Sequence, residues 1–442
     1  MTSVSIMRTK AEDAIIGAFA DVADRLPGTA GIAAARSAAI EVFKENGLPH
    51  RRIEEWKYTD LRSALPEISP PMIPSQAVTS LDRAAVDAAI SSLAGVDAQR
   101  IVFADGAYRP DLSDAELDAG LQVRSLAQIL SDGREAEPLS IADGAGSIAA
   151  LNTAFVTDGA VIDVADGADI ARPIFIIELR VGVEASLTST RHVLRVGNRA
   201  KATFVQVFAR SKGAATGQTN TFTQTVIGDG AEVSHVNVCI EHDVTHLSTS
   251  QVSVGGDASY RGFQYTSAVA LARHQVIAQF TGENAKLDLS GAFLARGKQH
   301  VDNTLVVNHD VPGCVSRELF KGVLDDDARG VFQGKVIVQP EAQKTDGKQM
   351  AQALLLSESC EFDSKPELEI YADDVICGHG STCAEIDPEM VFYCRSRGIP
   401  EETARALLIE AFISEAIEQV EQESVAAALG EMASAWLDTN RN

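Results

Sequence analysis

The motif GNRA at residues 197–200 returns as GDGA at 228–231, GGDA at 255–258 and GENA at 282–285. The closing alanines are 31, 27 and 27 residues apart. In each copy the second and the seventh residue after the alanine are apolar, namely Ala202, Val233, Tyr260 and Leu287, and Val207, Val238, Tyr265 and Ala292. A tight turn followed by a strand, repeated at about this period, predicts the coil of a parallel β-solenoid. A β-sandwich or β-barrel has a similar density of strands and stays an alternative at this point.

Two less regular copies extend the repeat, DGAD around Ala168 and DDDA at 325–328. The three aspartates at 325–327 offer carboxylate oxygens of the kind that bind a hard cation, but Asp also favours tight turns. We interpret them as the repeated turn.

Helical patterns lie on both sides of the β-rich region. The segment 9–46 carries an apolar stripe that Pro27 and Gly28 interrupt, and Asp387, Pro388 and Glu389 form a typical helix start. We therefore expect a mainly β chain with a parallel β-helix core flanked by helical domains. The expected boundaries are 1–95 for an N-terminal helical domain, 96–158 for a mixed α/β connecting region, 159–386 for the core and 387–442 for a C-terminal helical domain.

Composition limits the kind of partner. The 442 residues are 45% hydrophobic and 23% charged, with a formal net charge of −24. So negative a surface, with no run of Lys and Arg, repels nucleic acid and anionic lipid. Because no stretch of 18 apolar residues occurs, we expect a cytoplasmic protein without a membrane segment, whose six cysteines are thiols.

The segment from Cys377 to Cys383, CGHGSTC, offers the most suggestive ligands. Thiolate and imidazole suit zinc or iron-sulfur chemistry, and on a strand Cys377 and His379 point to the same side. Two or three ligands do not complete a tetrahedral site. His379 is therefore either a structural histidine or part of a labile site that another chain completes.

Two other motifs carry less weight. His242 and His246 in EHDVTH have the spacing of a zinc pair, but the segment is strand-like and lacks a glutamate directly after the first histidine, so we interpret it as a solvated loop. Each Gly-Lys pair is followed by Gln or Val, so no nucleotide-binding P-loop is present, and we expect the chain to bind no nucleotide.

Three segments resemble the SufD family of iron-sulfur cluster assembly scaffolds, which is related to SufB. They are EEWKYTDLR at Glu54–Arg62, KPELEIYADDVICGHGST at Lys365–Thr382 and FYCRSRGI at Phe392–Ile399. The resemblance implies a right-handed parallel β-helix between helical domains. It also implies a non-catalytic scaffold that forms a heterocomplex with SufB and the ATPase SufC, or a homodimer when SufB is absent.

The resemblance also implies roles for individual residues. His379 matches the family histidine at the SufB–SufD interface, where a transient iron-sulfur cluster is shared, and Cys377 matches the neighbouring cysteine. Gly378 stands where many relatives carry serine, and Cys383 and Cys394 lie outside the family signature. The C-terminal helical region of the family docks the ATPase, which makes a set of residues here candidates for partner binding: Phe392, Arg395, Arg397, Leu408, Phe412 and Ile413.

The main alternative is an intracellular polysaccharide-acting enzyme built on a β-helix. Such enzymes display catalytic acidic groups along one strand face. The sequence shows no evident array of carboxylates of this kind.

Overall fold

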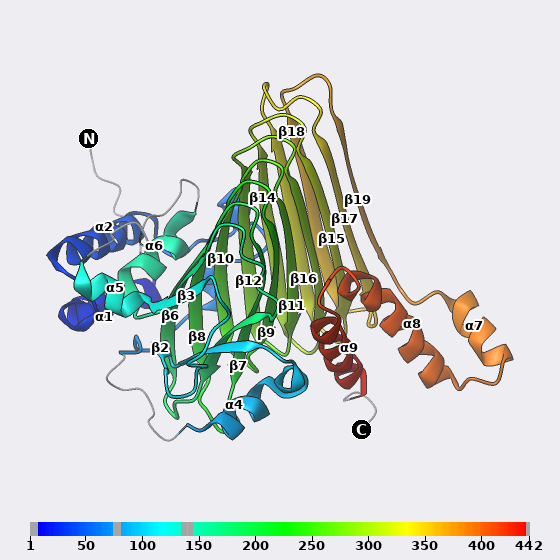
Figure 1. Cartoon of the computed structure of the whole chain (residues 1–442). Helices are drawn as coiled ribbons and strands as arrows, with labels where there is room; N and C mark the ends of the chain where they lie inside the picture. Colours follow the sequence, from blue (N-terminus) through cyan, green and yellow to red (C-terminus); the bar gives the residue numbers. More distant parts are fainter. Residues whose placement is uncertain (1–7, 74–80, 134–138, 140–144, 439–442) are drawn as a thin grey trace, which may run out of the picture.

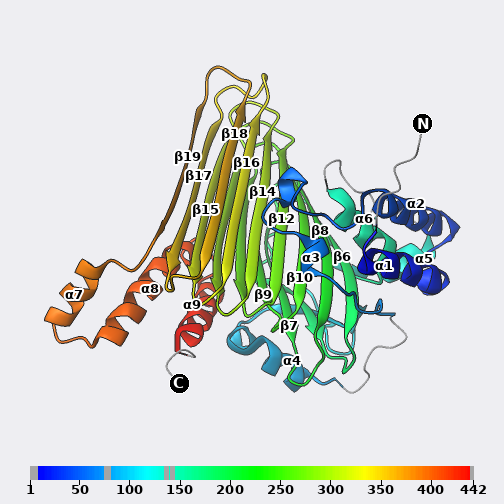
Figure 2. The same ribbon diagram turned by 180° about the vertical axis from the view of Figure 1, so that it is seen from behind.

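Two long sheets wound from one chain form the body of the molecule (Figures 1 and 2). The structure is a computed structural model that describes residues 8–73, 81–133, 139 and 145–438. One sheet holds the odd-numbered strands in the order β19-β17-β15-β13-β11-β9-β7-β5-β1 with β2 at its end, and the other runs β18-β16-β14-β12-β10-β8-β6-β4-β3. The pairs from β4 to β19 are parallel, and each strand pairs with the strand two further along the chain. The parallel solenoid is confirmed, and the sandwich and barrel are excluded.

The strands are β1 (Gln99–Ala104), β2 (Ala107–Tyr108), β3 (Leu121–Ser125), β4 (Ala160–Val164), β5 (Ile174–Arg180), β6 (Ser186–Val196), β7 (Lys201–Arg210), β8 (Gly217–Ile227), β9 (Glu232–Ile240), β10 (Thr245–Val254), β11 (Ser259–Ser267), β12 (Leu271–Phe280), β13 (Lys286–Ala295), β14 (His300–His309), β15 (Val315–Leu324), β16 (Arg329–Val338), β17 (Asp346–Leu355), β18 (Glu361–Ile370) and β19 (Ile376–Ala384). The helices are α1 (Lys10–Val22), α2 (Ala30–Asn46), α3 (Leu61–Ala64), α4 (Arg83–Ile90), α5 (Leu126–Asp132), α6 (Gly146–Phe155), α7 (Pro388–Ser396), α8 (Glu401–Ile417) and α9 (Glu423–Asp438).

The positions that repeat in the sequence are paired with one another in the odd-numbered sheet. Ala202, Val233, Tyr260 and Leu287 lie opposite one another on successive strands and belong to the core between the two sheets. Val207, Val238, Tyr265 and Ala292 form a second ladder, five residues on. An odd number of residues reverses the side of a strand, so this second ladder faces outward, into the core under the helices.

The repeated turns stack so closely that their first residue has no room for a side chain. A Cβ on Gly282 would lie 2.2 Å from the backbone nitrogen of Gly256 in the turn below. The closing alanines are at most 1% exposed, and Cys314 and Ala342 take their place in the next two coils. Small residues are therefore required at the first position of these four turns.

The assignment of DDDA at 325–328 as a further copy of this repeat is wrong. It connects β15 to β16, whereas the repeated motifs connect an even-numbered strand to an odd-numbered one, so it lies at the other end of the coil. Its interpretation as a turn is confirmed, because Asp326 adopts a φ of 55° and its backbone N–H bonds Asp325 and Ser357.

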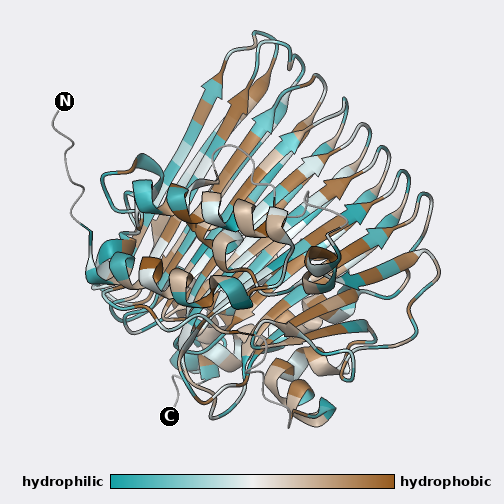
Figure 3. Cartoon of the chain, turned by 90° about the vertical axis from the view of Figure 1, so that its left-hand side faces the viewer, coloured by the Kyte–Doolittle hydropathy of each residue, from teal (hydrophilic) through white to brown (hydrophobic). Residues whose placement is uncertain are grey.

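Helices cover the outer faces of both sheets. Helix α6 packs on β6 and β8 and is itself covered by α2, while α4 packs on β7 and α8 packs on β13 and β15. Region 96–158 is continuous with the solenoid, because β1 and β3 join the two sheets at their first strands. Hydrophobic bands recur along the strands in Figure 3. Within the described residues, no helix combines the length and apolar character that a membrane span requires.

Candidate functional site

The two sheets end in β18 and β19, which have no neighbour beyond them in the described part of the chain. No residue of either strand is fully buried, whereas strands in the middle of the solenoid are mostly buried. Ile370, Tyr371 and Ile376 around this edge are 40%, 60% and 66% exposed. Both sheets therefore present unpaired backbone groups and apolar side chains at this end, which we call the open end.

His379 and Cys377 both lie on β19 at the open end. Cys377 contacts the core between the sheets, and burial raises the pKa of its thiol. His379 is two residues further on the same side and is exposed, opposite Gln349 of β17. Among the described residues, the one group of at least three His, Cys, Asp or Glu side chains close enough to share a metal ion lies elsewhere. The two ligands at the open end therefore form an incomplete set within this chain.

Two further cysteines follow this pair along the chain. Cys383 is exposed on the same strand, and Cys394 is half-buried on α7. All six cysteines are free thiols, as the sequence predicted.

The predicted partner-binding residues have very different surroundings. Helix α7 projects away from the solenoid in both views of the molecule, with Phe392 72% exposed on it (Figures 1 and 2). Arg395 pairs with Glu401 at 3.1 Å, and the guanidinium of Arg397 lies 3.6 Å from the ring centre of Tyr393. A cleft of about 410 Å³ lies between α7, α8 and the turn from β17 to β18, and Phe392 and Arg395 line it.

Helix α8 exposes less of its predicted partner-binding surface than its sequence suggested. Ile413 is 1% exposed and belongs to the core under the odd-numbered sheet, so its side chain does not reach a partner in this conformation. Phe412 is half-buried with the Lys321 ammonium 4.4 Å from its ring, and Leu408 is half-buried as well. Helix α9 packs on α8, and both helices contribute to the core under the odd-numbered sheet.

A second cluster, inside the solenoid, was missed by sequence reasoning. Cys239 and Glu241 at the end of β9 and His246 at the start of β10 each offer a ligand atom, and these atoms lie within 4.8 Å of one another. His246 is fully buried, so the interpretation of EHDVTH as a solvated loop is wrong for this residue, although His242 is exposed. The available signal was the spacing of Cys239 and Glu241, which puts both on one side of a strand.

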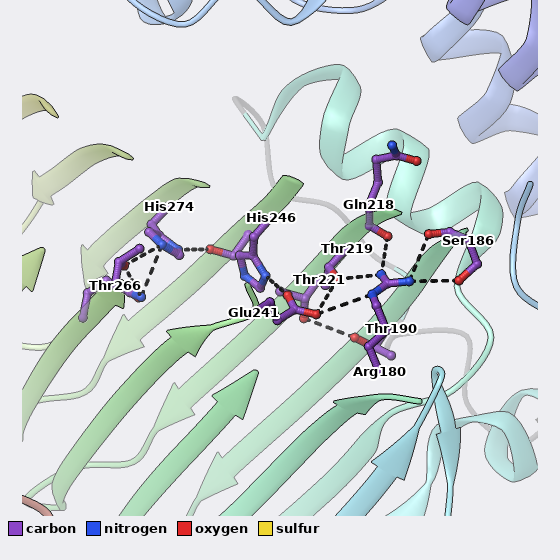
Figure 4. Close-up of polar contacts among 12 residues, drawn as sticks. Arg180, Ser186, Thr190, Gln218, Thr219, Thr221, Glu241, His246, Thr266 and His274 are labelled. Atoms are coloured by element: carbon purple, nitrogen blue, oxygen red, sulfur yellow. Dashed lines mark hydrogen bonds and ion pairs between the residues drawn. The ribbon is translucent and has the colours of Figure 1, made fainter. Parts of the chain in front are cut away.

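Polar neighbours hold the carboxylate of this internal cluster, as Figure 4 shows. Thr219 Oγ1 donates to Glu241 Oε1 at 3.0 Å, and Arg180 Nε lies 3.8 Å from the same oxygen. The other oxygen, Oε2, is 2.8 Å from His246 Nδ1. Burial and the nearby carboxylate raise the pKa of the Cys239 thiol well above its usual value.

A buried acidic residue lies two strands inward from His379 in the odd-numbered sheet. Glu318, Gln349 and His379 occupy matching positions on β15, β17 and β19. Glu318 and Gln349 are 2% and 3% exposed, and none of their four side-chain polar atoms has a hydrogen-bond partner. Burial raises the pKa of Glu318 to about 8, so this side chain is mainly a neutral acid at pH 7.

Comparison with known proteins covers nearly all of the chain. The SUF system FeS cluster assembly, SufBD core domain, matches residues 179–412, and the SufBD protein N-terminal region matches residues 25–176. The chain is 31% identical to the iron-sulfur cluster assembly protein SufD of Escherichia coli over 87% of its own length and 88% of that protein. It is 30% identical to a SufBD family protein of Synechocystis, over 87% and 86% of the two chains.

A third relative, SufD of Bacillus subtilis, is 26% identical over 63% of this chain and 64% of its own length. These matches confirm the resemblance seen in the three sequence segments and favour it over a polysaccharide-acting enzyme. The chain belongs to the SufBD family of iron-sulfur cluster assembly proteins.

Proposed function

We propose that this chain is a scaffold subunit, without catalytic activity of its own, in a complex with a SufB-like protein and a SufC-like ABC-type ATPase. The observation that carries the proposal is the open end, where the edge strand β19 bears the two candidate ligands of the family motif, Cys377 and His379. A second solenoid with a similar free edge can extend both sheets by adding strands to β18 and β19.

The incomplete ligand pair suits the handling of a cluster as cargo. A cluster that must be passed on is released more easily when few side chains of one protein bind it. In the proposed complex His379 binds the nascent cluster at the seam between the two solenoids, and the SufB-like chain supplies the remaining ligands. Cys377 is the weaker candidate, because burial opposes formation of its thiolate.

The ATPase is proposed to dock on the C-terminal helical region, chiefly on α7. This helix exposes Phe392 and Tyr393 and borders the cleft that Arg395 lines. The chain itself binds no nucleotide in this proposal, in keeping with the missing P-loop. Movement of the ATPase subunits would be transmitted through α7 and α8 to the solenoid, and would open and close the seam.

The proposal also includes a homodimer and a cytoplasmic location. In the absence of a SufB-like protein, the same open end would join two copies of this chain as a homodimer. The complex would act in the cytoplasm, where a reducing environment keeps exposed thiols such as Cys383 free.

The test uses the complex purified anaerobically from cells that express tagged wild-type chain, His379→Ala or His242→Ala. His242 is an exposed histidine far from the open end in sequence and serves as the matched control. We expect His379→Ala to recover the same subunits as wild type but to form at least about tenfold less cluster on reconstitution with iron and sulfide, as when a ligand is lost. An equal cluster yield for His379→Ala and His242→Ala would refute the role of His379.

A further inference from the structure

The internal cluster of Cys239, Glu241 and His246 has the geometry of a metal site. The turn at residues 241–244 reverses the chain between the two sheets and brings the start of β10 against the end of β9. All three side chains point into the space between the sheets and are at most 3% exposed. Their ligand atoms already lie within 4.8 Å of one another, so a small change in side-chain torsions would bring them to metal-bonding distance.

One ring nitrogen in this cluster has no partner. His246 Nδ1 meets Glu241 Oε2, but His246 Nε2 is buried and has no hydrogen-bond partner in the structure. A buried polar atom without a partner loses its hydration without compensation, so such atoms usually have a reason to be there. A bound cation would satisfy this nitrogen, either directly or after rotation of the ring.

The neighbouring groups act as a supporting shell rather than as ligands. His274 is already engaged at both ring nitrogens, with Ser248 Oγ at 2.7 Å and Thr266 Oγ1 at 3.0 Å (Figure 4). The ring of Phe208 packs 4.5 Å from the ring of His246 and restricts its orientation. A small cavity lined by Glu241, Arg180 and Thr219 among others lies on the Glu241 side of the cluster.

We propose that Cys239, Glu241 and His246 bind a single divalent transition metal ion inside the solenoid, at a site separate from His379. One sulfur, one nitrogen and one oxygen ligand suit Zn²⁺ or Fe²⁺ and do not suit Mg²⁺ or Ca²⁺, which prefer oxygen alone. Binding releases the thiol proton of Cys239 to solvent, and the thiolate and carboxylate then balance the two positive charges. Arg180 adds a positive charge beside Glu241, which favours an anion such as hydroxide or sulfide as fourth ligand.

The test uses Co²⁺ as a spectroscopic probe of thiolate ligands. The host protein carries Cys377→Ser, Cys383→Ser and Cys394→Ser, which leaves the three buried cysteines Cys239, Cys314 and Cys360. It is incubated without oxygen with Co²⁺ until binding is complete, since a buried site fills slowly. We expect one equivalent of Co²⁺ to give a sulfur-to-cobalt charge-transfer band, which Zn²⁺ abolishes.

Cys239→Ser in this host should lose the band, and Cys314→Ser should keep it, because Cys314 is equally buried but lies outside the cluster. No band in the host, or an unchanged band in Cys239→Ser, would overturn the proposal. If Cys239→Ser fails to fold, X-ray absorption spectroscopy of the Zn²⁺-loaded host identifies the ligand atoms instead. One sulfur in the first shell supports the site, and a shell of only nitrogen and oxygen overturns it. Because the host lacks Cys377 and the readout is metal binding by the isolated chain, failure here leaves the proposed function untouched.

Discussion

The pKa of Glu318, a single side chain near the open end, is changed by the groups around it. Its carboxyl group faces the space between the sheets on β15, and neither oxygen has a hydrogen-bond partner. Burial raises its pKa to about 8 in spite of the hydroxyl of Ser316 and the charge of Arg317, which favour the ionised form; the charge of Asp288 adds to the rise. The folded protein therefore holds a proton that the unfolded chain gives up.

We predict that Glu318 lowers stability as pH rises. An unfolded glutamate loses its proton near about pH 4.3, whereas the folded one keeps it up to about pH 8. Between these values the folded state binds more protons than the unfolded state, so the free energy of unfolding falls with rising pH, by at most about 1.4 kcal/mol per pH unit from this group. Glu318→Gln keeps the shape and removes the effect.

Thermal unfolding from pH 5 to pH 9 checks this prediction. The melting temperature of Glu318→Gln should exceed that of wild type increasingly above pH 6, while Glu358→Gln, an exposed glutamate, should follow wild type. Curves for Glu318→Gln and wild type that stay parallel over the whole range would show that the carboxyl is not buried as described.

Residues of the candidate sites could be predicted where alternation along a strand decides their side. Cys377 and His379 share one side of β19 because they are two apart, as the sequence predicted. His246 could not be placed in the same way. Its burial depends on a strand from another part of the chain that closes over it, and nothing in EHDVTH alone reports that strand.

At the scale of elements, the segment Glu54–Arg62 acts as a strap across the even-numbered sheet. Trp56 lies 3.8 Å from the guanidinium of Arg273 on β12, and Gln333 on β16 donates to the backbone oxygen of Glu55. Glu54 pairs with Lys365 on β18 at 2.5 Å. The strap therefore connects the N-terminal helices to strands close to the open end, which gives a physical reason for the sequence signature at Glu54–Arg62.

The ion pair beneath this strap should matter more than those on the surface. Arg273 and Asp302 bond directly and are 2% and 0% exposed, and Thr59 of the strap also donates to Asp302. Asp302→Ala leaves a buried guanidinium without its partner, so we expect a loss of about 3–5 kcal/mol in the free energy of unfolding.

Urea denaturation measures this loss, with Glu421→Ala as control. Glu421 pairs with Arg261 where both side chains are more than a third exposed, so its removal should cost under about 1 kcal/mol. Similar losses for the two variants would argue against a strap that depends on the Asp302 pair.

The repeated motif predicted the turns that lead from even-numbered to odd-numbered strands. It gave no sign of the turns at the opposite end of the coils. The four turns that end in Ala200, Ala231, Ala258 and Ala285 stack so closely that their first and last residues are small. The turns at the opposite end differ in length, from 211–216 to 268–270, and impose no shared motif. Helix α9 of the same chain packs on α8, which the pattern of residues within α8 could not reveal.

At the scale of the whole molecule, the two ends of the solenoid differ. At the first end, β2 and β3 are antiparallel to their neighbours and close the sheets, while at the open end β18 and β19 continue the parallel order without a cap. The C-terminal helices follow directly after the open end. This asymmetry brings a free sheet edge and the projecting helix α7 to the same part of the molecule (Figure 2).

We predict that α7 and the open end bind different partners. Phe392→Asp should lose the ATPase and keep the second solenoid chain on anaerobic purification, because Phe392 is 72% exposed and its replacement leaves the fold intact. Val42→Asp, on α2 and 43% exposed, should keep both partners. A point substitution is used because a truncation after Arg397 would remove α8 and α9 from the core of the odd-numbered sheet. Loss of both partners in Phe392→Asp would contradict separate docking surfaces.

The most direct measurement is the subunit composition of the complex when the free edge is blocked. Tagged wild-type chain, Ile376→Lys and Val42→Lys are purified without oxygen from their own cells, and the partners are identified and quantified by mass spectrometry. A lysine on the edge strand opposes sheet extension, so Ile376→Lys should lose the second SufBD-family chain while it keeps the ATPase, and Val42→Lys should keep both. Equal recovery of that second chain with Ile376→Lys, or its absence from the wild-type complex, would contradict the account.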